Sequence, residues 1–364
     1  MTAVRLDRAR TAAARVGVDV LLVTPGADLR YLTGYQAMPL ERLTCLVLPT
    51  IGDPVLVVPT LERPAAEASP VGAMALEIVD WQETDDPVRL VAKLVPDARR
   101  IAIDDHMWAE HVLRFRAAMP DAEQVLAGPL LRELRIRKSP DEIAALREAG
   151  AAIDRVQARM GEWLRAGRTE RDVGRDIADA IISEGHQRVD FVIVASGPNS
   201  ASPHHSASDR VIEAGDPVVV DIGGTTPDGY CSDETRTYVI GSPPDEFAVA
   251  YVTLHRAQMA AVEHARTGVT AESVDATARE VLMAAGLGDY FTHRTGHGIG
   301  LETHEEPYIV AGNTRVLEAG MAFSIEPGFY LPERFGARIE DIVVITDAGG
   351  AERLNLRPRE LGVL

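Results

Sequence analysis

The sequence predicts two domains of mixed architecture, a small α/β domain over residues 1–127 and a larger α+β domain over residues 139–364. Three observations predict this division. The chain has 364 residues, whereas one domain takes roughly 100 to 200. Strand-like and helix-like segments alternate in its first third. Its second part contains two similar segments, 167–185 and 268–286, which indicate a domain built from two related halves.

The first domain reads as short apolar strands separated by turns and helices. Residues 18–23 (VDVLLV) form an apolar run typical of a buried strand. Two further apolar runs flank a Gly52–Asp53 turn and predict a hairpin, at residues 44–49 and 54–59. Residues 99–120 predict a strand followed by a helix. The polar residues here show no catalytic spacing, so we expect the chemistry in the second domain.

A linker is expected at residues 128–138, before a strong helix start. Ser139, Pro140 and Glu142 form a capping box with proline at the first helical position. Apolar residues at helical spacing then continue as far as Gly167, which predicts one long helix. The second domain therefore begins at residue 139.

The two similar segments each predict an amphipathic helix. Both begin Gly-x-Thr and end at glycine, with Thr169 and Thr270 as helix caps. Each is followed by a segment that is rich in histidine, FVIVASGPNSASPHHS in one case and FTHRTGHGIGLETH in the other. A duplicated α+β half folded around a shared cleft accounts for both observations.

Composition excludes several classes of function. The formal net charge of −18 and the lack of any basic run exclude nucleic acid as a partner. No apolar stretch is long enough to cross a membrane, and arginines interrupt the first twenty residues where a signal peptide would be apolar. Cys45 and Cys231 are too few for a disulfide framework. We therefore expect a cytoplasmic protein.

Acidic residues recur in the apolar strands of the second domain. Asp221 follows Val218–Val220, and Asp233 comes after a turn that could return it beside Asp221. Taken alone, an aspartate before two glycines is typical of a turn. Two adjacent carboxylates in an apolar setting, however, need a cation to stay ionised.

Glu326 and Glu340 repeat this arrangement in residues 321–327 and 337–345. Strand alternation places Arg338 and Glu340 on one face, although the same pair also suits a solvated strand. His297 lies in the glycine-dense loop TGHGIG, which allows close approach to a cleft. A lone histidine there is more often structural; the four carboxylates favour a ligand.

Together these side chains form a ligand set of mostly hard oxygens with one nitrogen. Such a set suits manganese, cobalt, iron or zinc, and two divalent ions balance four carboxylates. The set is Asp221, Asp233, His297, Glu326 and Glu340.

These motifs resemble the pita-bread metallopeptidase family, in its Xaa-Pro dipeptidase (prolidase) and Xaa-Pro aminopeptidase branch. The resemblance covers nearly the whole chain, with a creatinase-type N-terminal domain, then LRIRKSPDEIAALREAGAAIDRV (134–156), then the five ligands in order. It implies a pita-bread catalytic domain of pseudo-twofold halves and a homodimer. One departure is the interval from Asp221 to Asp233, one residue longer than the family's usual eleven, so we expect the TTPDG tip to bulge or lengthen.

The resemblance also implies residue roles. Asp221 would bind one metal, Asp233 and Glu340 would bridge two, and His297 and Glu326 would complete the set. His204, His304 and Glu326 are the implied catalytic residues, with His205 as an alternative to His204. The implied substrate-binding residues are His293, Arg338 and Tyr230.

The expected activity is hydrolysis of short peptides, Xaa-Pro dipeptides first, by a hydroxide held between two divalent ions, manganese before cobalt, zinc or iron. Glu326 would accept the proton, and His204 and His304 would stabilise the oxyanion. The main alternative is an Xaa-Pro aminopeptidase acting on longer peptides. A methionine aminopeptidase, a metal-independent creatinase-like amidinohydrolase and a non-catalytic binding protein are further alternatives.

Overall fold

The computed structural model describes residues 2–364. These fall into two compact units that meet at the boundary between Arg135 and Ile136. Residues 128–138, expected as a linker, include helix α6 (Gly128–Arg135), which belongs to the first unit. In this described part of the chain, no helix combines the length and apolarity needed to cross a membrane.

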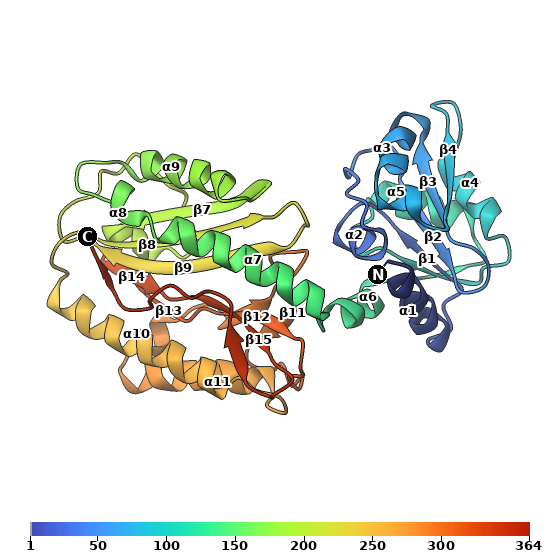
Figure 1. Ribbon diagram of the computed structural model, residues 1–364. Helices are drawn as coiled ribbons and strands as arrows, with labels where there is room; N and C mark the ends of the chain where they lie inside the picture. Colours follow the sequence, from blue (N-terminus) through green and yellow to red (C-terminus); the bar gives the residue numbers. More distant parts are fainter. Residues whose placement is uncertain (1) are drawn as a thin grey trace. The chain divides into compact units, whose positions relative to one another are not determined.

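The first unit is a six-stranded mixed sheet with helices (Figure 1). The expected hairpin is confirmed, because β2 and β3 pair antiparallel, while β1 pairs with β5 in parallel. The strand order is β4-β3-β2-β1-β5-β6. The strands are β1 (Val20–Val23), β2 (Cys45–Pro49), β3 (Val55–Pro59), β4 (Glu77–Trp81), β5 (Arg100–Ile103) and β6 (Glu123–Leu126). The other α-helices are α1 (Thr2–Arg15), α2 (Ala27–Thr33), α3 (Arg63–Ala68), α4 (Pro87–Leu94) and α5 (Ala109–Ala118).

The second unit consists of two α+β halves, as predicted. In the first half, helices pack on a four-stranded sheet of order β17-β9-β8-β7. Its strands are β7 (Arg188–Ser196), β8 (Pro217–Thr225), β9 (Cys231–Val239) and β17 (Gly362–Val363), and its helices are α7 (Pro140–Gln157), α8 (Met160–Trp163) and α9 (Glu170–Ser183). The long helix expected from residue 140 is wrong beyond Gln157, because Arg159 leaves helical backbone (φ −98°, ψ 5°).

In the second half, two helices cover a five-stranded sheet of order β11-β10-β12-β15-β16. The helices are α10 (Asp245–His264) and α11 (Ala271–Ala284). The strands are β10 (Gly296–Gly298), β11 (Glu305–Ile309), β12 (Ala322–Ile325), β15 (Asp341–Ile345) and β16 (Ala351–Arg353), and a separate hairpin is formed by β13 (Gly328–Leu331) and β14 (Phe335–Arg338). Figure 1 shows α10 and α11 on one side of the strands and α9 on the other.

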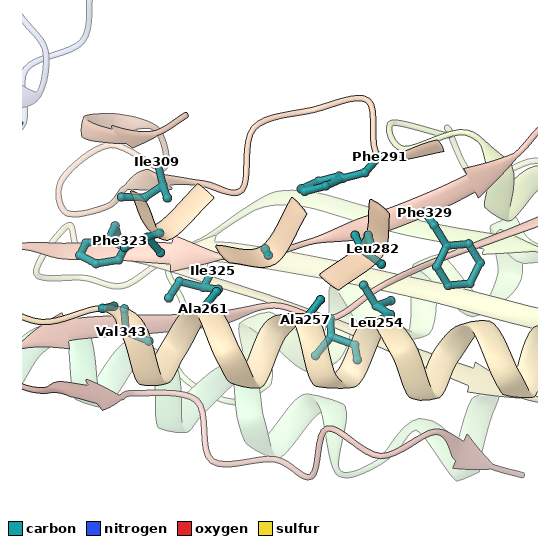
Figure 2. Packing of buried hydrophobic residues seen from close by; sticks show 14 of the residues in the cluster. Leu254, Ala257, Ala261, Leu282, Phe291, Ile309, Phe323, Ile325, Phe329 and Val343 are labelled. Atoms are coloured by element: carbon teal, nitrogen blue, oxygen red, sulfur yellow. The ribbon is translucent and has the colours of Figure 1, made fainter. Parts of the chain in front are cut away.

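The similar segments of the sequence become corresponding helices, α9 in one half and α11 in the other. Thr169 caps α9 by accepting from the Asp172 amide, as expected, whereas the Thr270 side chain makes no such bond. Apolar residues of α10 and α11 pack on the second sheet, and Figure 2 shows Leu254 and Ala261 among them. Burial of these apolar residues holds the helices on this sheet.

Candidate active site

The first sheet presents two aspartates on one face. Strands β8 and β9 pair without a register shift, so that Asp233 lies opposite Gly223 and Thr235 lies opposite Asp221. Because residues two apart in a strand share a face, Asp221 and Asp233 project from the same face as diagonal neighbours. The hairpin therefore returns the second carboxylate beside the first, as predicted.

The hairpin that joins these aspartates closes in a turn after Thr225. Strand pairing continues to Thr225, and the turn closes where the Thr226 amide donates to the Tyr230 carbonyl. Gly229 occupies the left-handed region there with φ of 91°, which favours glycine. The strands stay in register as far as Thr225, so the predicted bulge or lengthening is confined to the tip, residues 226–230.

Tyr230 lies outside the cleft, which corrects the assignment of this residue to substrate binding. Its hydroxyl donates to the Glu142 carboxylate at 3.1 Å, and its buried ring packs in a cluster with Leu146 of α7. The tyrosine precedes β9 at the turn, where the two-residue alternation of the strand does not determine the side-chain direction. Tyr230 therefore supports the start of α7.

The second sheet brings His297 to the site through a close approach of backbones. A Cβ atom added at Gly296 would lie 1.9 Å from the Ser324 carbonyl oxygen, and one at Gly298 would lie 2.2 Å from that of Glu306. Only glycine fits such contacts. The glycines of the TGHGIG motif thus allow β10 to pack between its neighbours with the imidazole facing the carboxylates.

Glu326 and Glu340 lie at strand ends. Glu326 directly follows β12 and Glu340 directly precedes β15, and these strands pair with Ile325 opposite Asp341. The prediction of one continuous strand over 337–345 is wrong, because β14 ends at Arg338 and β15 starts at Asp341. The break turns Glu340 toward the first sheet, where its carboxylate accepts from the Thr235 hydroxyl at 2.7 Å.

The acidic residues of both halves converge in a buried group. Ligand atoms of Asp233, His297 and Glu340 lie within 4.8 Å of one another. Burial, followed by the charges of neighbouring carboxylates, raises the pKa of Asp233 and Glu340 well above the usual range. Burial also raises the pKa of Glu326 to about 7, against the opposing charge of Arg338. Such a group needs further positive charge to remain ionised.

Two observations show that this group fits metal cations. Oδ1 of Asp221 and Oε1 of Glu340 are buried, and neither finds a hydrogen-bond donor among the described residues. His297 lies 3.6 Å from Asp233 and 3.3 Å from Glu326 through Nε2, while its Nδ1 lies 3.0 Å from the Gly298 carbonyl. An Nδ1 proton donated to that carbonyl leaves the Nε2 lone pair facing the carboxylates, which is the form that binds metals.

Arg338 is held in the site by several neighbours. Its guanidinium donates to Asp221 at 2.6 Å, to the Tyr330 hydroxyl at 2.8 Å and to Thr235 at 3.1 Å. The Tyr330 hydroxyl in turn lies 2.8 Å from Nε2 of His293. Burial, followed by the charge of Arg338, lowers the pKa of His293 to about 3, so this imidazole is neutral and accepts from Tyr330. The residues form a connected chain along one wall.

Glu170 binds one of the two adjacent histidines, His204 and His205, and leaves the other facing the cleft. Nε2 of His205 lies 2.7 Å from the buried Glu170 carboxylate, whereas His204 faces the cleft. Glu170 also accepts hydrogen bonds from Ser196, Asn199 and Ser208. This one carboxylate therefore holds the segment that presents His204.

The convergent side chains line a cleft of about 760 Å³, a size that accommodates a small ligand. All five predicted ligands line it, as do His204, His293, His304 and Arg338. The His304 ring lies 4.1 Å from that of His297, centroid to centroid. The cleft combines acidic groups that suit cations with imidazoles that suit proton transfer or hydrogen bonding.

Sequence reasoning missed three residues at this site. Tyr330 lies in an apolar strand and gave no signal. Glu170 lies in the similar segment 167–185 and is buried at the first residue of its helix, where a carboxylate needs partners. Arg294 lies three residues before His297 and lines the cleft; its position beside the glycine-dense loop is the sequence feature that indicates it.

Comparison with known proteins gives two family matches. Residues 144–347 match the model described as "Metallopeptidase family M24", which is more than half of the chain. Residues 5–137 match the "Creatinase/Prolidase N-terminal domain".

Named relatives extend over almost the full length. A probable dipeptidase PepE of Mycobacterium tuberculosis is 55% identical over 361 residues, covering 99% of this chain and 96% of the relative. An Xaa-Pro dipeptidase of Lactobacillus helveticus is 36% identical and covers 91% of each. The crystal structure of a recombinant prolidase from Thermococcus sibiricus superposes with a TM-score of 0.93 at 38% identity, covering 99% of this chain and 98% of the other.

Proposed function

The chain belongs to metallopeptidase family M24, and on that premise we propose that it hydrolyses Xaa-Pro dipeptides. The observation that carries the proposal is the convergence of buried acidic groups and one imidazole in a cleft that fits a short peptide. The dipeptidase and prolidase names of its relatives support the choice of substrate.

Two divalent metal ions are proposed as cofactors. Their ligands would be Asp221, Asp233, His297, Glu326 and Glu340. When bound, the ions would supply Lewis acidity and lower the pKa of water from about 15.7 toward about 7. Manganese is the proposed metal because oxygen ligands predominate, and cobalt, zinc and iron are alternatives.

The protein's own groups would move the proton and stabilise charge. Glu326 lines the cleft and would accept a proton and later return it to the leaving nitrogen. His204 and His304 would donate hydrogen bonds to the carbonyl oxygen as it gains negative charge. Arg338 and Tyr330 would keep Asp221 and His293 in place.

The runner-up activity is an Xaa-Pro aminopeptidase, which would cleave longer peptides with the same residues. A methionine aminopeptidase is disfavoured, because residues 5–137 match a creatinase/prolidase domain. A homodimer remains our expectation, and light scattering of the purified protein tests it.

The test measures the metal content and the turnover of the same purified proteins. Purified protein should contain about two divalent ions per chain and release proline from Ala-Pro after manganese is added. Asp233→Ala should lose bound metal and turnover together, and Glu326→Gln should lose turnover. Surface variant Arg334→Met serves as the control. Full activity in Asp233→Ala, or a wild-type protein that binds metal and cleaves no Xaa-Pro peptide, would contradict the proposal.

A further inference from the structure

We propose that Thr235 is a positioning residue of the metal site: its hydroxyl fixes the orientation of the Glu340 carboxylate and thereby raises the affinity for the ions. The inference rests on the proposed function, because it takes Glu340 as a metal ligand. It goes beyond that function, since Thr235 acts through Glu340 and binds neither metal nor substrate.

Thr235 lies on the face of β9 that carries the site. Strand alternation puts it on the same face as Asp233, two residues earlier, and it lies opposite Asp221 of β8. Its side chain is buried and does not line the cleft. A hydroxyl buried beside acidic groups needs hydrogen-bond partners, and those partners determine what it does.

The two partners of the Thr235 hydroxyl fix the direction of its proton. Its oxygen lies 2.7 Å from Oε2 of Glu340 and 3.1 Å from Nε of Arg338. A guanidinium has donors and no acceptor, so the hydroxyl accepts from Arg338. Its single proton is therefore donated to Glu340.

The backbone of Glu340 is also held by β9. Its amide donates to the Thr235 carbonyl at 3.1 Å, and its carbonyl accepts from the guanidinium of Arg236. Arg236 is itself buried, and it donates to Asp341 at 2.7 Å and to the Pro358 carbonyl at 2.9 Å. With the backbone held at both groups, Glu340 keeps only the rotation of its side chain. The Thr235 hydroxyl restricts that rotation.

The two oxygens of the Glu340 carboxylate have different surroundings. Oε2 accepts from Thr235, whereas Oε1 is buried and finds no hydrogen-bond donor among residues 2–364. The carboxylate belongs to the group with Asp233 and His297 whose ligand atoms lie within 4.8 Å of one another. Thr235 thus holds one oxygen and leaves the other available to a cation. Because the protein alone makes these contacts, an ion does not have to order the carboxylate on binding.

Thr237 provides a matched comparison for a purely structural role. It lies two positions further along the same face of β9 and is also buried. Its hydroxyl donates to the Arg338 carbonyl at 2.9 Å and accepts from the Arg338 amide at 3.2 Å. Both of these bonds join backbone groups, whereas the hydroxyl of Thr235 bonds a carboxylate. Thr237→Val is therefore the control.

The experiment measures the binding of manganese(II) to metal-free protein by calorimetry, with no peptide present. Thr235→Val keeps the branched shape and removes the hydroxyl, and we expect the Kd for manganese to rise about 10- to 100-fold, as is typical when a partner of a metal ligand is lost. Thr235→Ser restores the hydroxyl and should bind manganese nearly as tightly as wild type. Thr237→Val should keep the wild-type affinity. The absorption spectrum of cobalt-loaded protein, which reports coordination geometry, should change in Thr235→Val alone.

Urea titration of the metal-free proteins separates this effect from a loss of stability. Both valine variants leave buried groups without a partner and should lower the unfolding midpoint by similar amounts. Thr235→Ala is a second variant without the hydroxyl, for use where Thr235→Val does not fold. Unchanged manganese affinity in Thr235→Val, an equal loss in Thr237→Val, or a Thr235→Ser variant as weak as Thr235→Val would overturn the role of Thr235.

The measurement does not depend on the substrate. A wild type that binds manganese and cleaves no Xaa-Pro peptide would contradict the proposed function, and the comparison of affinities would still decide the role of Thr235. A wild type that binds no manganese would overturn both proposals.

Discussion

In each half of the second unit, a carboxylate on a helix accepts hydrogen bonds from the segment that carries a histidine of the site. The position of the carboxylate in the helix differs between the halves. In the first half, Glu170 of α9 binds the segment that presents His204. In the second, Asp275 of α11 accepts from the amide and hydroxyl of Thr295, two residues before His297. Glu170 is the first residue of its helix and Asp275 the fifth. The halves therefore share a hydrogen-bonded contact between a helix carboxylate and the histidine-bearing segment, here called the tether. They differ in where the carboxylate lies along the helix.

The halves differ more in how they present carboxylates. Asp221 and Asp233 come from adjacent strands in continuous register, whereas Glu326 and Glu340 come from strand ends. A regular hairpin specifies side-chain direction by alternation alone, but a strand end depends on where the pairing stops. The first half is thus the more predictable from sequence, and the second is the more sensitive to backbone packing.

The largest effect is expected from the histidine that the first half presents. His204→Ala should retain bound metal and lower kcat by about 100- to 1000-fold, the loss typical of an oxyanion donor. Metal analysis and single-turnover kinetics measure the two properties separately. His264→Ala, on α10 and outside the cleft, is the control. Unchanged turnover in His204→Ala would remove this residue from the mechanism.

A glycine of the second half should be next in effect. Gly296→Ala places a methyl group 1.9 Å from a backbone oxygen, and we expect a loss of about 3 kcal/mol in the free energy of unfolding together with weaker metal binding. Urea titration measures the first. Gly350→Ala is the matched control because its added methyl group meets no atom within 4 Å. Equal stabilities would show that β10 packs less closely than described.

The tether of the first half predicts a dependence on pH. Burial alone would raise the pKa of Glu170, but hydrogen bonds from Ser208, Ser196 and His205 lower it to about 2. Because the folded pKa lies below the unfolded value of about 4.3, the stabilisation is complete above that value and declines as pH falls toward 2. Lowering the pH from 7 to 3 should remove about 2 kcal/mol of this stabilisation.

Urea titrations of wild type and Glu170→Gln at pH 7, 5 and 3 test this dependence. The difference in unfolding free energy between the two proteins should shrink as the pH is lowered. A difference that stays constant would mean that the charge of Glu170 contributes nothing.

The smallest effect is expected at the tip of the first hairpin. Tyr230→Phe removes the hydrogen bond to Glu142 and should cost about 1 kcal/mol of stability. Because Tyr230 lies outside the cleft, kcat/KM for Ala-Pro should stay within about twofold of wild type. A large fall in kcat/KM with normal stability would restore Tyr230 to substrate binding.

The sequence predicts the two-domain fold and the gathering of the acidic residues in one site. Strand periodicity and the spacing of the motifs are sufficient for both predictions. The prediction for Tyr230 is wrong, since side-chain direction at a turn does not follow the strand period. The pairing of Arg338 with Asp221, and the chain through Tyr330 to His293, joins residues distant in sequence with no local pattern. Such contacts follow from the packing of the two sheets and not from either segment alone.

The hydrogen bonds of Glu170 affect the affinity for a peptide as well as the position of His204. A segment with helix η3 (Gly197–Ala201) and short irregular stretches would be costly to order at the moment of binding, at roughly 1 to 2 kcal/mol per backbone residue. Glu170 orders it during folding. A peptide that enters the cleft therefore meets a preorganised His204, and its contacts can contribute to binding without offsetting the conformational entropy of that segment.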